Sequence, residues 1–476
     1  MKIVLISAPY LDVYGTLNVG KNHTFSLGVG YVAAVLRDAG HQVSLLDPEP
    51  LGMSDGAIKE YLKSKEPDLV GISSATANFK GAIRMAHLAK EVSKPTTIIG
   101  GVHASALPLE TLRDYPEFDI VVIGEGEETM EELCRHLESG KEVLQDIKGI
   151  AYRGNGRLEK TPPRTLIQNL DQLPFPAREM VDLNLYRPQV HLYRGRKSAT
   201  ILTSRGCPAP CAFCATAVTM GNRFRKHSPE YVLREIRHLV TEYGIQDFVI
   251  VDDTFTIDKQ RVVAICNQII EQGLDIGWFC FARVDNATVD LYETMKKAGC
   301  FSMFFGIESA DPQVLKNIKK GTTVEQARKA LHLANKIGLK TEAGFMLANP
   351  GDTRASIKKT IALARELNPV IASFNIMTPF PGTEEYERYL PLDPVGMRNW
   401  DNFIPKGITP LIEPDGLSRR DLQKFLVEAY LRFYLRPQQL LRILRNITSW
   451  EEFKVYLRGG LGLFRRIWEW VKASNK

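Results

Sequence analysis

The sequence predicts an α/β protein with an N-terminal doubly wound parallel sheet, then a complete or partial parallel barrel, and finally a helical C-terminal tail. Short apolar runs alternate with helical patterns through residues 1–140 and again through residues 196–415. This alternation is typical of parallel sheets, because a crossover between neighbouring parallel strands usually contains a helix. A linker at residues 141–195 and a tail at residues 416–476 complete the four predicted regions.

The N-terminal unit has two loops that suit a ligand. Strands are expected at 2–7, 42–46, 69–73, 96–99 and 120–123, with an amphipathic helix at 28–39. Gly100-Gly101-Val102-His103 and Gly124-Glu125-Gly126-Glu127 directly follow two of these strands. Glycine lets a large planar or phosphate-bearing ligand approach the backbone at this edge of the sheet. Neither loop matches a dinucleotide fingerprint or a P-loop, so a nucleotide, a flavin, a partner protein or no ligand at all remain open.

A cysteine loop follows an expected strand at 199–203. It reads Ser204-Arg205-Gly206-Cys207-Pro208-Ala209-Pro210-Cys211-Ala212-Phe213-Cys214, a C-x3-C-x2-C run. Three thiolates leave one iron of a four-iron cluster without a protein ligand, and an open iron can hold a substrate. Zinc with a distant fourth ligand and partial disulfides are the alternatives. Zinc usually needs a second cysteine pair or histidines, and no second pair accompanies His227, so the pattern favours the cluster.

Strand and helix units continue after the cysteine loop. Strands are expected at 248–251, 277–284, 301–308, 341–347 and 371–378, and helices at 229–243 and 324–337. Parallel barrels bind ligands at the carboxyl ends of their strands. Polar residues occur at these ends: Asp252, Asp253, Arg283 and Glu308. A single carboxylate there is more often a helix cap or an ion-pair partner, but their joint occurrence after the cysteine loop favours a ligand site.

The cysteine spacing, with Phe213 before the last cysteine, resembles the radical S-adenosylmethionine (SAM) superfamily. The resemblance implies that Cys207, Cys211 and Cys214 hold a [4Fe-4S] cluster whose open iron binds SAM, which is then split into methionine and a 5'-deoxyadenosyl radical. It also implies SAM contacts, with Asp252 and Asp253 near the amino group and Glu308 near the ribose. Phe213 and Arg283 join these expected cofactor contacts. The segments 344–353 and 378–383 resemble later signatures of the same superfamily.

Ahead of such a core, the N-terminal sheet resembles the cobalamin-binding domain of B12-dependent radical SAM enzymes, and residues 170–178 resemble their joining segment. The implied cobalamin contacts are Gly100, Gly101, His103, Gly124, Glu125 and Gly126. Many cobalamin proteins carry an Asp-x-His-x-x-Gly motif, which is absent here, and Tyr14 stands where the histidine of Asp12-Val13-Tyr14-Gly15 would be required. Cobalamin would therefore bind without that lower ligand. For His103, a place near the corrin and a structural role in its loop are both open.

The positive charge of the chain is concentrated in its tail. Residues 417–476 contain 13 Lys and Arg against 5 Asp and Glu, whereas the whole chain carries a net charge of +6. Two apolar helical faces are expected there, formed by Leu440, Leu441, Leu444 and Ile447 and by Leu463, Phe464, Ile467, Trp468 and Val471. Neither is long enough to span a bilayer. Such helices either lie on an anionic membrane or pack on the barrel, and nucleic acid is not an expected partner.

Cysteine usage predicts a reducing compartment. The chain has seven cysteines, and its start at Met1 runs directly into a strand without a secretory segment. We therefore expect a cytoplasmic protein, with membrane association through the tail left open. Four cysteines lie in apolar patterns and are expected in the core: Cys134, Cys266, Cys280 and Cys300.

The resemblances together imply a B12-dependent radical SAM enzyme. The leading reaction is methyl transfer from methylcobalamin to an unactivated carbon of a small or lipid-like molecule, with a donor such as flavodoxin or ferredoxin supplying electrons. The alternatives are a cyclase or rearrangement enzyme, a cobalamin-independent radical SAM enzyme, and a non-catalytic iron–sulfur or corrinoid-binding module. A methylthiotransferase fits poorly, because residues 1–150 contain the single cysteine Cys134. The sequence identifies no catalytic acid or base.

Overall fold

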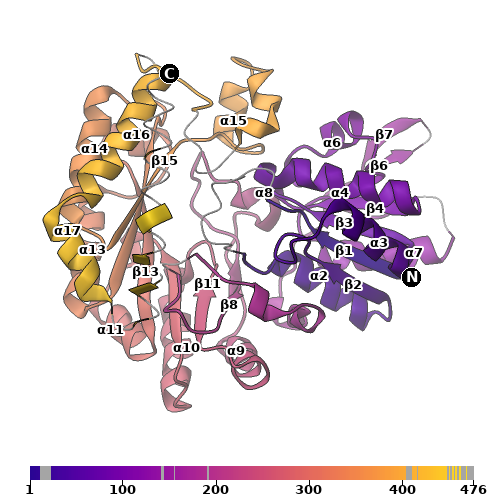
Figure 1. Ribbon diagram of the computed structural model, residues 1–476, viewed down its shortest axis with the longest axis horizontal. Coiled ribbons are helices and arrows are strands. Elements are labelled where there is room, and N and C mark those ends of the chain that lie inside the picture. Colours follow the sequence, from indigo (N-terminus) through magenta and orange to yellow (C-terminus); the bar gives the residue numbers. More distant parts are fainter. Residues whose placement is uncertain are drawn as a thin grey trace.

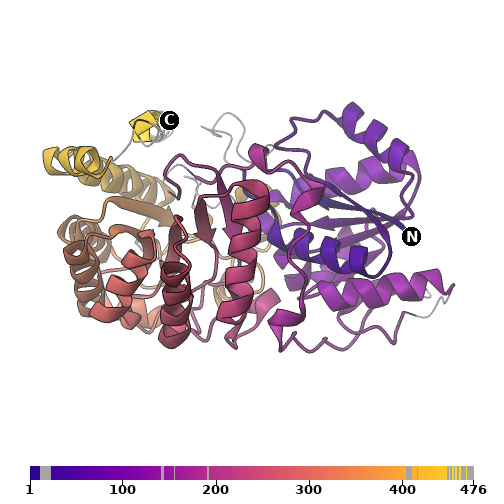
Figure 2. The ribbon, with the colours of Figure 1, turned by 90° about the horizontal axis from the view of Figure 1, so that it is seen from below.

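A computed structural model gives the fold of the chain (Figure 1). It describes residues 1–10, 23–140, 144–154, 156–189, 192–403, 410–414, 416–447, 450, 453–454, 456–457, 460–462 and 468. Two large sheets, each with its own helices, form the two halves of an elongated molecule (Figure 2). None of the described helices has the length and apolar character needed to cross a membrane.

The first sheet has seven strands in the order β2-β1-β3-β4-β5-β6-β7. They are β1 (Lys2–Ser7), β2 (Gln42–Leu46), β3 (Leu69–Ser73), β4 (Thr96–Gly100), β5 (Ile120–Val122), β6 (Ile150–Gly154) and β7 (Arg157–Lys160). The first five are parallel, and the strand order reverses between β1 and β3. A doubly wound sheet binds its ligands at such a point. The antiparallel hairpin of β6 and β7 lies within the predicted linker and extends this sheet.

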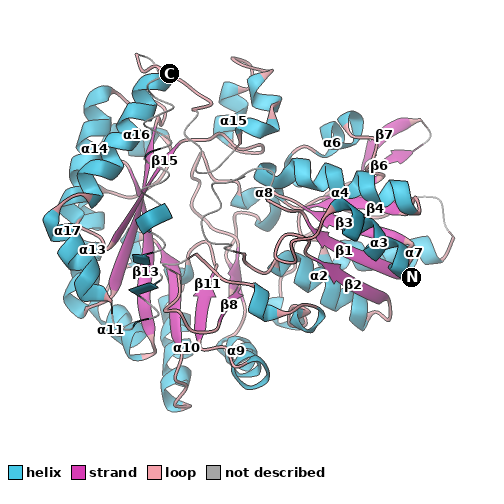
Figure 3. Ribbon diagram, in the orientation of Figure 1, coloured by secondary structure: helices cyan, strands magenta, loops and turns pink. Residues whose placement is uncertain are grey.

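Helices cover both faces of the first sheet (Figure 3). Helices α2 (Leu27–Asp38) and α7 (Glu127–Glu138) contact each other, as do α3 (Asp55–Lys65) and α4 (Phe79–Val92). Side chains alternate along β1, so that Leu5 packs into the core beneath α2 while Val4 packs into the core beneath α4. The prediction of a doubly wound sheet is therefore confirmed.

The second sheet is an open barrel of six parallel strands in the order β15-β14-β13-β12-β11-β8. They are β8 (Ser198–Ile201), β11 (Asp247–Ile250), β12 (Gly277–Ala282), β13 (Cys300–Glu308), β14 (Lys340–Leu347) and β15 (Ile371–Ile376). The crossover helices include α9 (Pro229–Tyr243), α10 (Lys259–Glu271), α11 (Val289–Lys297), α13 (Val324–Ile337) and α14 (Arg354–Leu367). They lie outside the curved sheet (Figure 1). The predicted partial barrel is confirmed, with β8 and β15 as its edges.

Local signals fix the helix ends of the barrel. The Ser228 hydroxyl accepts a hydrogen bond from the backbone N–H of Tyr231 at 3.1 Å, and Pro229 occupies the first position of α9. Gly244 ends this helix in the left-handed conformation, at φ 65°. The Ser228 cap and Pro229 were expected from the sequence, because a serine cap satisfies a free N–H and proline suits the first helical position. Gly244 adds an end signal that the sequence reading did not use, because glycine adopts positive φ without strain.

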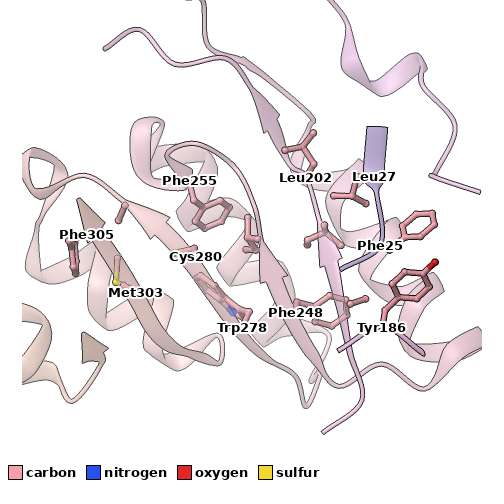
Figure 4. Close-up of a cluster of buried hydrophobic side chains, with 14 of the residues drawn as sticks. Phe25, Leu27, Tyr186, Leu202, Phe248, Phe255, Trp278, Cys280, Met303 and Phe305 are labelled. Carbon is pink, nitrogen blue, oxygen red and sulfur yellow. The ribbon is translucent and has the colours of Figure 1, made fainter. Parts of the chain in front are cut away.

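The linker binds both halves of the molecule. The backbone N–H of Ala177 donates to the carbonyl of Gly30 in α2 at 3.0 Å. The Arg178 guanidinium is buried and donates to Glu235 of α9 at 2.7 Å and to the carbonyl of Thr200 in β8 at 2.8 Å. One apolar core continues across the junction, where Phe25, Leu27 and Tyr186 gather beside Leu202 (Figure 4). The two sheets are thus held in one arrangement.

The first helix of the tail covers the β15 edge of the barrel. On α16 (Arg419–Tyr434), the Tyr430 hydroxyl donates to the carbonyl of Phe374 at 3.0 Å and accepts the N–H of the same residue at 3.3 Å. Tyr434 makes the corresponding pair with Ala372 at 2.9 and 3.1 Å. Open strand edges need such cover, because their backbone groups otherwise lack partners. Of the second predicted apolar face, Leu463, Phe464, Ile467 and Val471 lie outside the described residues.

Removing one tyrosine hydroxyl should measurably destabilise the barrel. Tyr430→Phe leaves both backbone groups of Phe374 without this partner, which costs about 1–3 kcal/mol for buried groups. Tyr292→Phe is the matched control, because within the described chain the buried Tyr292 hydroxyl has no hydrogen-bond partner. Urea unfolding of the two variants measures the difference. Equal free energies of unfolding would show that the hydroxyl does not hold the edge.

Candidate functional site

The cysteine loop presents three free thiols at the carboxyl end of β8. Cys207 and Cys211 are half-buried and Cys214 is exposed. The backbone holds the loop from two sides: the N–H of Ala212 donates to the carbonyl of Ile318 at 3.0 Å, and its carbonyl accepts the N–H of Glu385 at 3.2 Å. Among the described residues, no three His, Cys, Asp or Glu side chains are grouped to hold a single metal ion. Three free thiols suit a four-iron cluster, in which each cysteine binds a different iron.

Gly206 sets the start of the cysteine loop. It lies at φ +81°, and a Cβ there would stand 2.3 Å from the carbonyl oxygen of Arg223 and 2.8 Å from that of Met220. Both obstacles are backbone atoms, so the loop itself would have to move. An alanine at this position therefore conflicts with the described path of the loop.

Gly206→Ala is expected to lose most of the bound iron after anaerobic reconstitution, because the shifted loop misplaces Cys207. Gly244→Ala is the control, since Gly244 also has positive φ but a Cβ there meets nothing within 4 Å. We expect the control to keep its iron and to lose only about 1 kcal/mol of stability. Iron analysis together with cluster absorbance tests this, and full iron content in Gly206→Ala would refute the steric argument.

Three other predicted site residues gather around Lys320, which sequence analysis missed. The Lys320 ammonium lies 2.8 Å from the Glu308 carboxylate and 5.9 Å from the ring centre of Phe213. Its carbonyl accepts a hydrogen bond from Arg283 at 3.1 Å. Burial raises the pKa of the Cys211 thiol, while the positive charges of Lys320 and Arg283 act in the opposite direction. These cations therefore favour the thiolate that a cluster requires.

Glu308 reaches this group through an irregular strand end. It lies at φ +68°, and the pairing of β13 with β14 shifts register between Gly306 and Glu308. Bulges of this kind redirect side chains beside functional sites. Two of the three carboxylates expected to contact SAM thus lie close to the cysteine loop, Glu308 through Lys320 and Asp253 through Thr216.

The two neighbouring aspartates have different surroundings. Asp252 is buried and accepts hydrogen bonds from the Thr203 N–H at 2.6 Å, the Thr203 hydroxyl at 2.5 Å and the Ser204 hydroxyl at 2.5 Å. Burial raises the pKa of this carboxyl. Asp253 is exposed and accepts from the Thr216 hydroxyl at 2.7 Å, which lies 3.3 Å from the Cys214 sulfur. Asp252 therefore anchors the approach to the cysteine loop, and Asp253 is the one open to a ligand.

A cavity of about 330 Å³ lies at the carboxyl ends of the first sheet, facing the barrel. Its walls include the predicted residues Gly100, Gly101, Gly124, Glu125 and Gly126. Leu202, Val251 and two residues of α8 (Thr216–Met220) line the side that belongs to the second half of the chain. The cavity is therefore shared by both halves.

Glycines open this cavity to a large ligand. A Cβ at Gly28 would meet nothing within 4 Å, and at Gly100 and Gly124 the nearest protein atoms would be 3.8 Å away. Side chains there would project into the space that the glycines leave free. This cradle and its apolar walls fit a bulky planar cofactor such as cobalamin.

His103 does not line the cavity. Its ring stacks on Phe79 with 3.8 Å between ring centres and meets the edge of Trp400 at 4.7 Å. Its Nδ1 lies 3.2 Å from the Thr76 hydroxyl. Burial lowers the pKa of His103 to about 3, so the ring is neutral. Of the two roles left open for His103, the geometry supports the structural one.

Buried charges connect the cavity to the cysteine loop. Arg205, two residues before Cys207, donates to Glu125 at 2.8 Å and to Glu127 at 2.6 Å. Arg225 donates to both oxygens of Glu125 at 2.9 Å. All four side chains are at most 7% exposed. Burial opposes the Arg205 charge, but Glu127 and Glu125 outweigh it and raise the pKa of the guanidinium. This cluster, hereafter the Arg205 network, was not predicted from the sequence.

A second cavity, of about 470 Å³, lies inside the barrel. Aromatic rings of Phe279, Phe281 and Phe304 form much of its wall, and Glu342 and Asn375 supply polar groups. Tyr430, Tyr434, Ile443, Tyr456 and Gly460 of the tail close it on one side. An apolar chamber with a few polar groups is typical of small-molecule sites.

Comparison with known proteins identifies both halves. A model described as the B12 binding domain matches residues 15–134, and one of the Radical SAM superfamily matches residues 201–364. An uncharacterized methyltransferase of Pyrococcus horikoshii is 36% identical over 87% of this chain and 89% of its own. The anaerobic magnesium-protoporphyrin IX monomethyl ester cyclase of Rubrivivax gelatinosus is 28% identical over 92% of this chain and 78% of its own.

Two further similarities point to the same family. The hopanoid C-3 methylase of Methylococcus capsulatus is 30% identical over 76% of this chain and 68% of its own. The structure of the radical SAM methyltransferase TsrM from Kitasatospora setae, with cobalamin and a [4Fe-4S] cluster bound, superposes with a TM-score of 0.68. The superposition covers 82% of this chain and 75% of the TsrM chain, at 18% sequence identity. This structural similarity supports the fold. With both domain models matched in this order and close relatives spanning most of its length, the chain belongs to the cobalamin-dependent radical SAM enzymes.

Proposed function

We propose that this enzyme transfers a methyl group to an unactivated carbon of a small or lipid-like molecule. The observation that carries the proposal is the Arg205 network, which ties the glycine-lined cavity to the cysteine loop across the two halves of the chain. Two cofactors that must cooperate need such a fixed arrangement, because reacting groups have to meet in one geometry. The methyltransferase names of two relatives support the same reaction.

Each part of the site has a proposed task. Cys207, Cys211 and Cys214 would hold the [4Fe-4S] cluster, and Asp253 and Glu308 would orient SAM beside it. The glycine-lined cavity would hold cobalamin without a histidine ligand from His103. When bound, the cluster and SAM supply the radical that removes hydrogen, and cobalamin supplies the methyl group. The chain itself binds and orients the cofactors, and it excludes water from the site.

The aromatic cavity of the barrel is the proposed substrate site. Phe279, Phe281 and Phe304 offer an apolar surface, and Glu342 and Asn375 can accept or donate hydrogen bonds to a polar end of the substrate. Rigid walls also keep a radical away from water and from side reactions. Electrons would come from a donor such as flavodoxin or ferredoxin, reaching the cluster on the side of the exposed Cys214. We place the enzyme in the cytoplasm, where such donors and free thiols coexist.

A cyclase is the second candidate, because the cyclase relative aligns over 92% of this chain. The two reactions differ in their products from SAM. The test incubates reconstituted enzyme with reductant, SAM carrying a labelled methyl group, and candidate apolar substrates. Methyl transfer predicts S-adenosylhomocysteine alongside 5'-deoxyadenosine, with the label in the product. Deoxyadenosine with substrate conversion but without S-adenosylhomocysteine would favour the cyclase, and bound cofactors without SAM cleavage would indicate a non-catalytic module.

A further inference from the structure

The tail exposes an apolar helix face. On α17 (Pro437–Asn446), Leu440, Leu441 and Leu444 are 53%, 53% and 58% exposed. Positions i, i+1 and i+4 lie on one side of a helix, so these leucines form a continuous surface, hereafter the α17 face. The opposite side of α17 turns inward: Gln439 is buried and donates to the carbonyl of Val370 at 2.7 Å. The helix is therefore attached to the barrel by one side and free on the other.

Exposed apolar side chains are concentrated in this region. Eight of the fourteen large apolar side chains that are exposed in the described chain lie between residues 435 and 468. Besides the α17 face they are Leu435, Trp450, Leu457, Leu461 and Trp468. A contiguous apolar surface such as the α17 face marks an interaction site, whereas single exposed residues need no explanation. Tryptophan is also the residue type most suited to a membrane interface.

Arginines accompany this apolar surface. Arg442 and Arg445 line a polar cavity of about 380 Å³ together with Asn335 and Asn368, between α17 and the ends of α13 and α14. Arg436 lies beside it and donates to the carbonyl of Arg365 at 3.1 Å and to Asn368 at 3.2 Å. Neither Arg436 nor Arg445 forms an ion pair with any Asp or Glu that the structure describes. Arg445 is exposed, and it belongs to a tail with 13 Lys and Arg against 5 Asp and Glu, a charge that complements an anionic surface.

The same segment closes the proposed substrate cavity. Ile443, on the inner side of α17, lines that cavity together with Tyr456 and Gly460. Helix α16 packs against α14 and β15, and α17 packs against α16. One side of α17 thus faces the barrel, whereas the other carries the exposed leucines. Of the two arginines of this helix, Arg445 is exposed and Arg442 is half-buried.

We propose that the tail docks the enzyme on an anionic phospholipid membrane, with the α17 face in the interface and the exposed Arg445 at lipid phosphates. Interfacial helices bind membranes through apolar side chains together with basic residues, and each basic residue adds attraction to anionic lipid. The membrane would then supply an apolar substrate to the cavity behind the tail. That last step rests on the proposed function, but the docking itself does not.

Vesicle flotation with the full-length reconstituted enzyme tests the docking. The probes are vesicles of phosphatidylcholine alone and of phosphatidylcholine with phosphatidylglycerol. We expect binding to the anionic vesicles that weakens with salt, and little binding to the neutral ones. Leu440→Glu/Leu444→Glu should weaken binding at least about tenfold, because two apolar anchors are lost and two negative charges are added. Because flotation needs no substrate and no turnover, its outcome is independent of the proposed reaction.

The matched control is Leu392→Glu/Val395→Glu, which adds the same charge at residues that are 76% and 83% exposed elsewhere on the molecule. Thermal unfolding verifies that both variants remain folded. The control should bind like the unaltered enzyme. Absence of binding to anionic vesicles, or equal losses in both double variants, would overturn the proposal. So would gel filtration showing a dimer that Leu440→Glu/Leu444→Glu dissociates without any vesicle binding, since the α17 face would then join two copies of the chain.

Discussion

Gly28→Leu is expected to weaken cobalamin binding strongly while leaving the iron content unchanged. Gly28 lies in the first turn of α2 and lines the glycine-lined cavity, and a Cβ there meets no protein atom within 4 Å. A leucine side chain therefore fits the protein but occupies space meant for the ligand. Leucine also favours a helix over glycine by up to about 1 kcal/mol. The variant should bind cobalamin at least about tenfold more weakly, a loss of about 1.4 kcal/mol, without losing stability.

Gly56→Leu is a closely matched control. Gly56 occupies the same position in α3 as Gly28 does in α2, and a Cβ there approaches a single side-chain oxygen, that of Ser54, at 3.9 Å. It is not among the residues that line the cavity. Cobalt and iron are measured after reconstitution and desalting, and thermal unfolding is recorded for both variants. Normal cobalt retention in Gly28→Leu would mean that cobalamin does not occupy this cavity.

Arg205→Met is expected to destabilise the protein and to remove both cofactors together. The substitution leaves Glu127 buried without the cation that pairs with it at 2.6 Å. Breaking a buried ion pair by removing one partner costs about 3–5 kcal/mol, because a desolvated charge remains. The same side chain joins the glycine-lined cavity to the cysteine loop, so its loss should lower cobalt and iron content at once. Urea unfolding of the apoprotein and metal analysis measure the two effects separately.

Two comparisons test whether the buried charge is the cause. Arg37→Met removes an exposed arginine paired with Asp38 and Glu179, and should cost at most about 1 kcal/mol. Adding Glu127→Gln to Arg205→Met removes the stranded carboxylate and should recover part of the lost stability. If Arg205→Met is no worse than Arg37→Met, or if the second substitution recovers nothing, the Arg205 network does not hold the two halves together.

The fold was largely predictable because its strands are short apolar runs with strong local signals. The start of the helix at 229–243 was placed from Ser228 and Pro229, and the structure has the predicted bounds. The β6 and β7 hairpin was missed although Asn155-Gly156 is a recognised hairpin signal, because it falls in a stretch taken as linker. In the tail, the apolar pattern predicted α17 but could not tell which side faces the barrel. That depends on contacts such as Gln439 with Val370.

The site was only partly predictable. Spacing identified the three cysteines, because all lie on one loop. Asp252 and Asp253 were given one task, although neighbouring residues at a strand end tend to point in opposite directions. The Arg205 network joins residues about eighty positions apart, and His103 packs against Trp400 almost three hundred positions later. Such pairs follow from tertiary packing, which the local sequence pattern does not encode.

The most direct test of the account counts metals in the unaltered enzyme. The protein is purified without oxygen, reconstituted with iron, sulfide and hydroxocobalamin, and desalted before cobalt and iron are measured per chain. We expect about one cobalt and about four irons per chain, for one cobalamin and one [4Fe-4S] cluster. Four irons without cobalt would contradict the proposed reaction. The glycine-lined cavity would then not hold cobalamin, and methyl transfer would have no cobalamin to carry the methyl group.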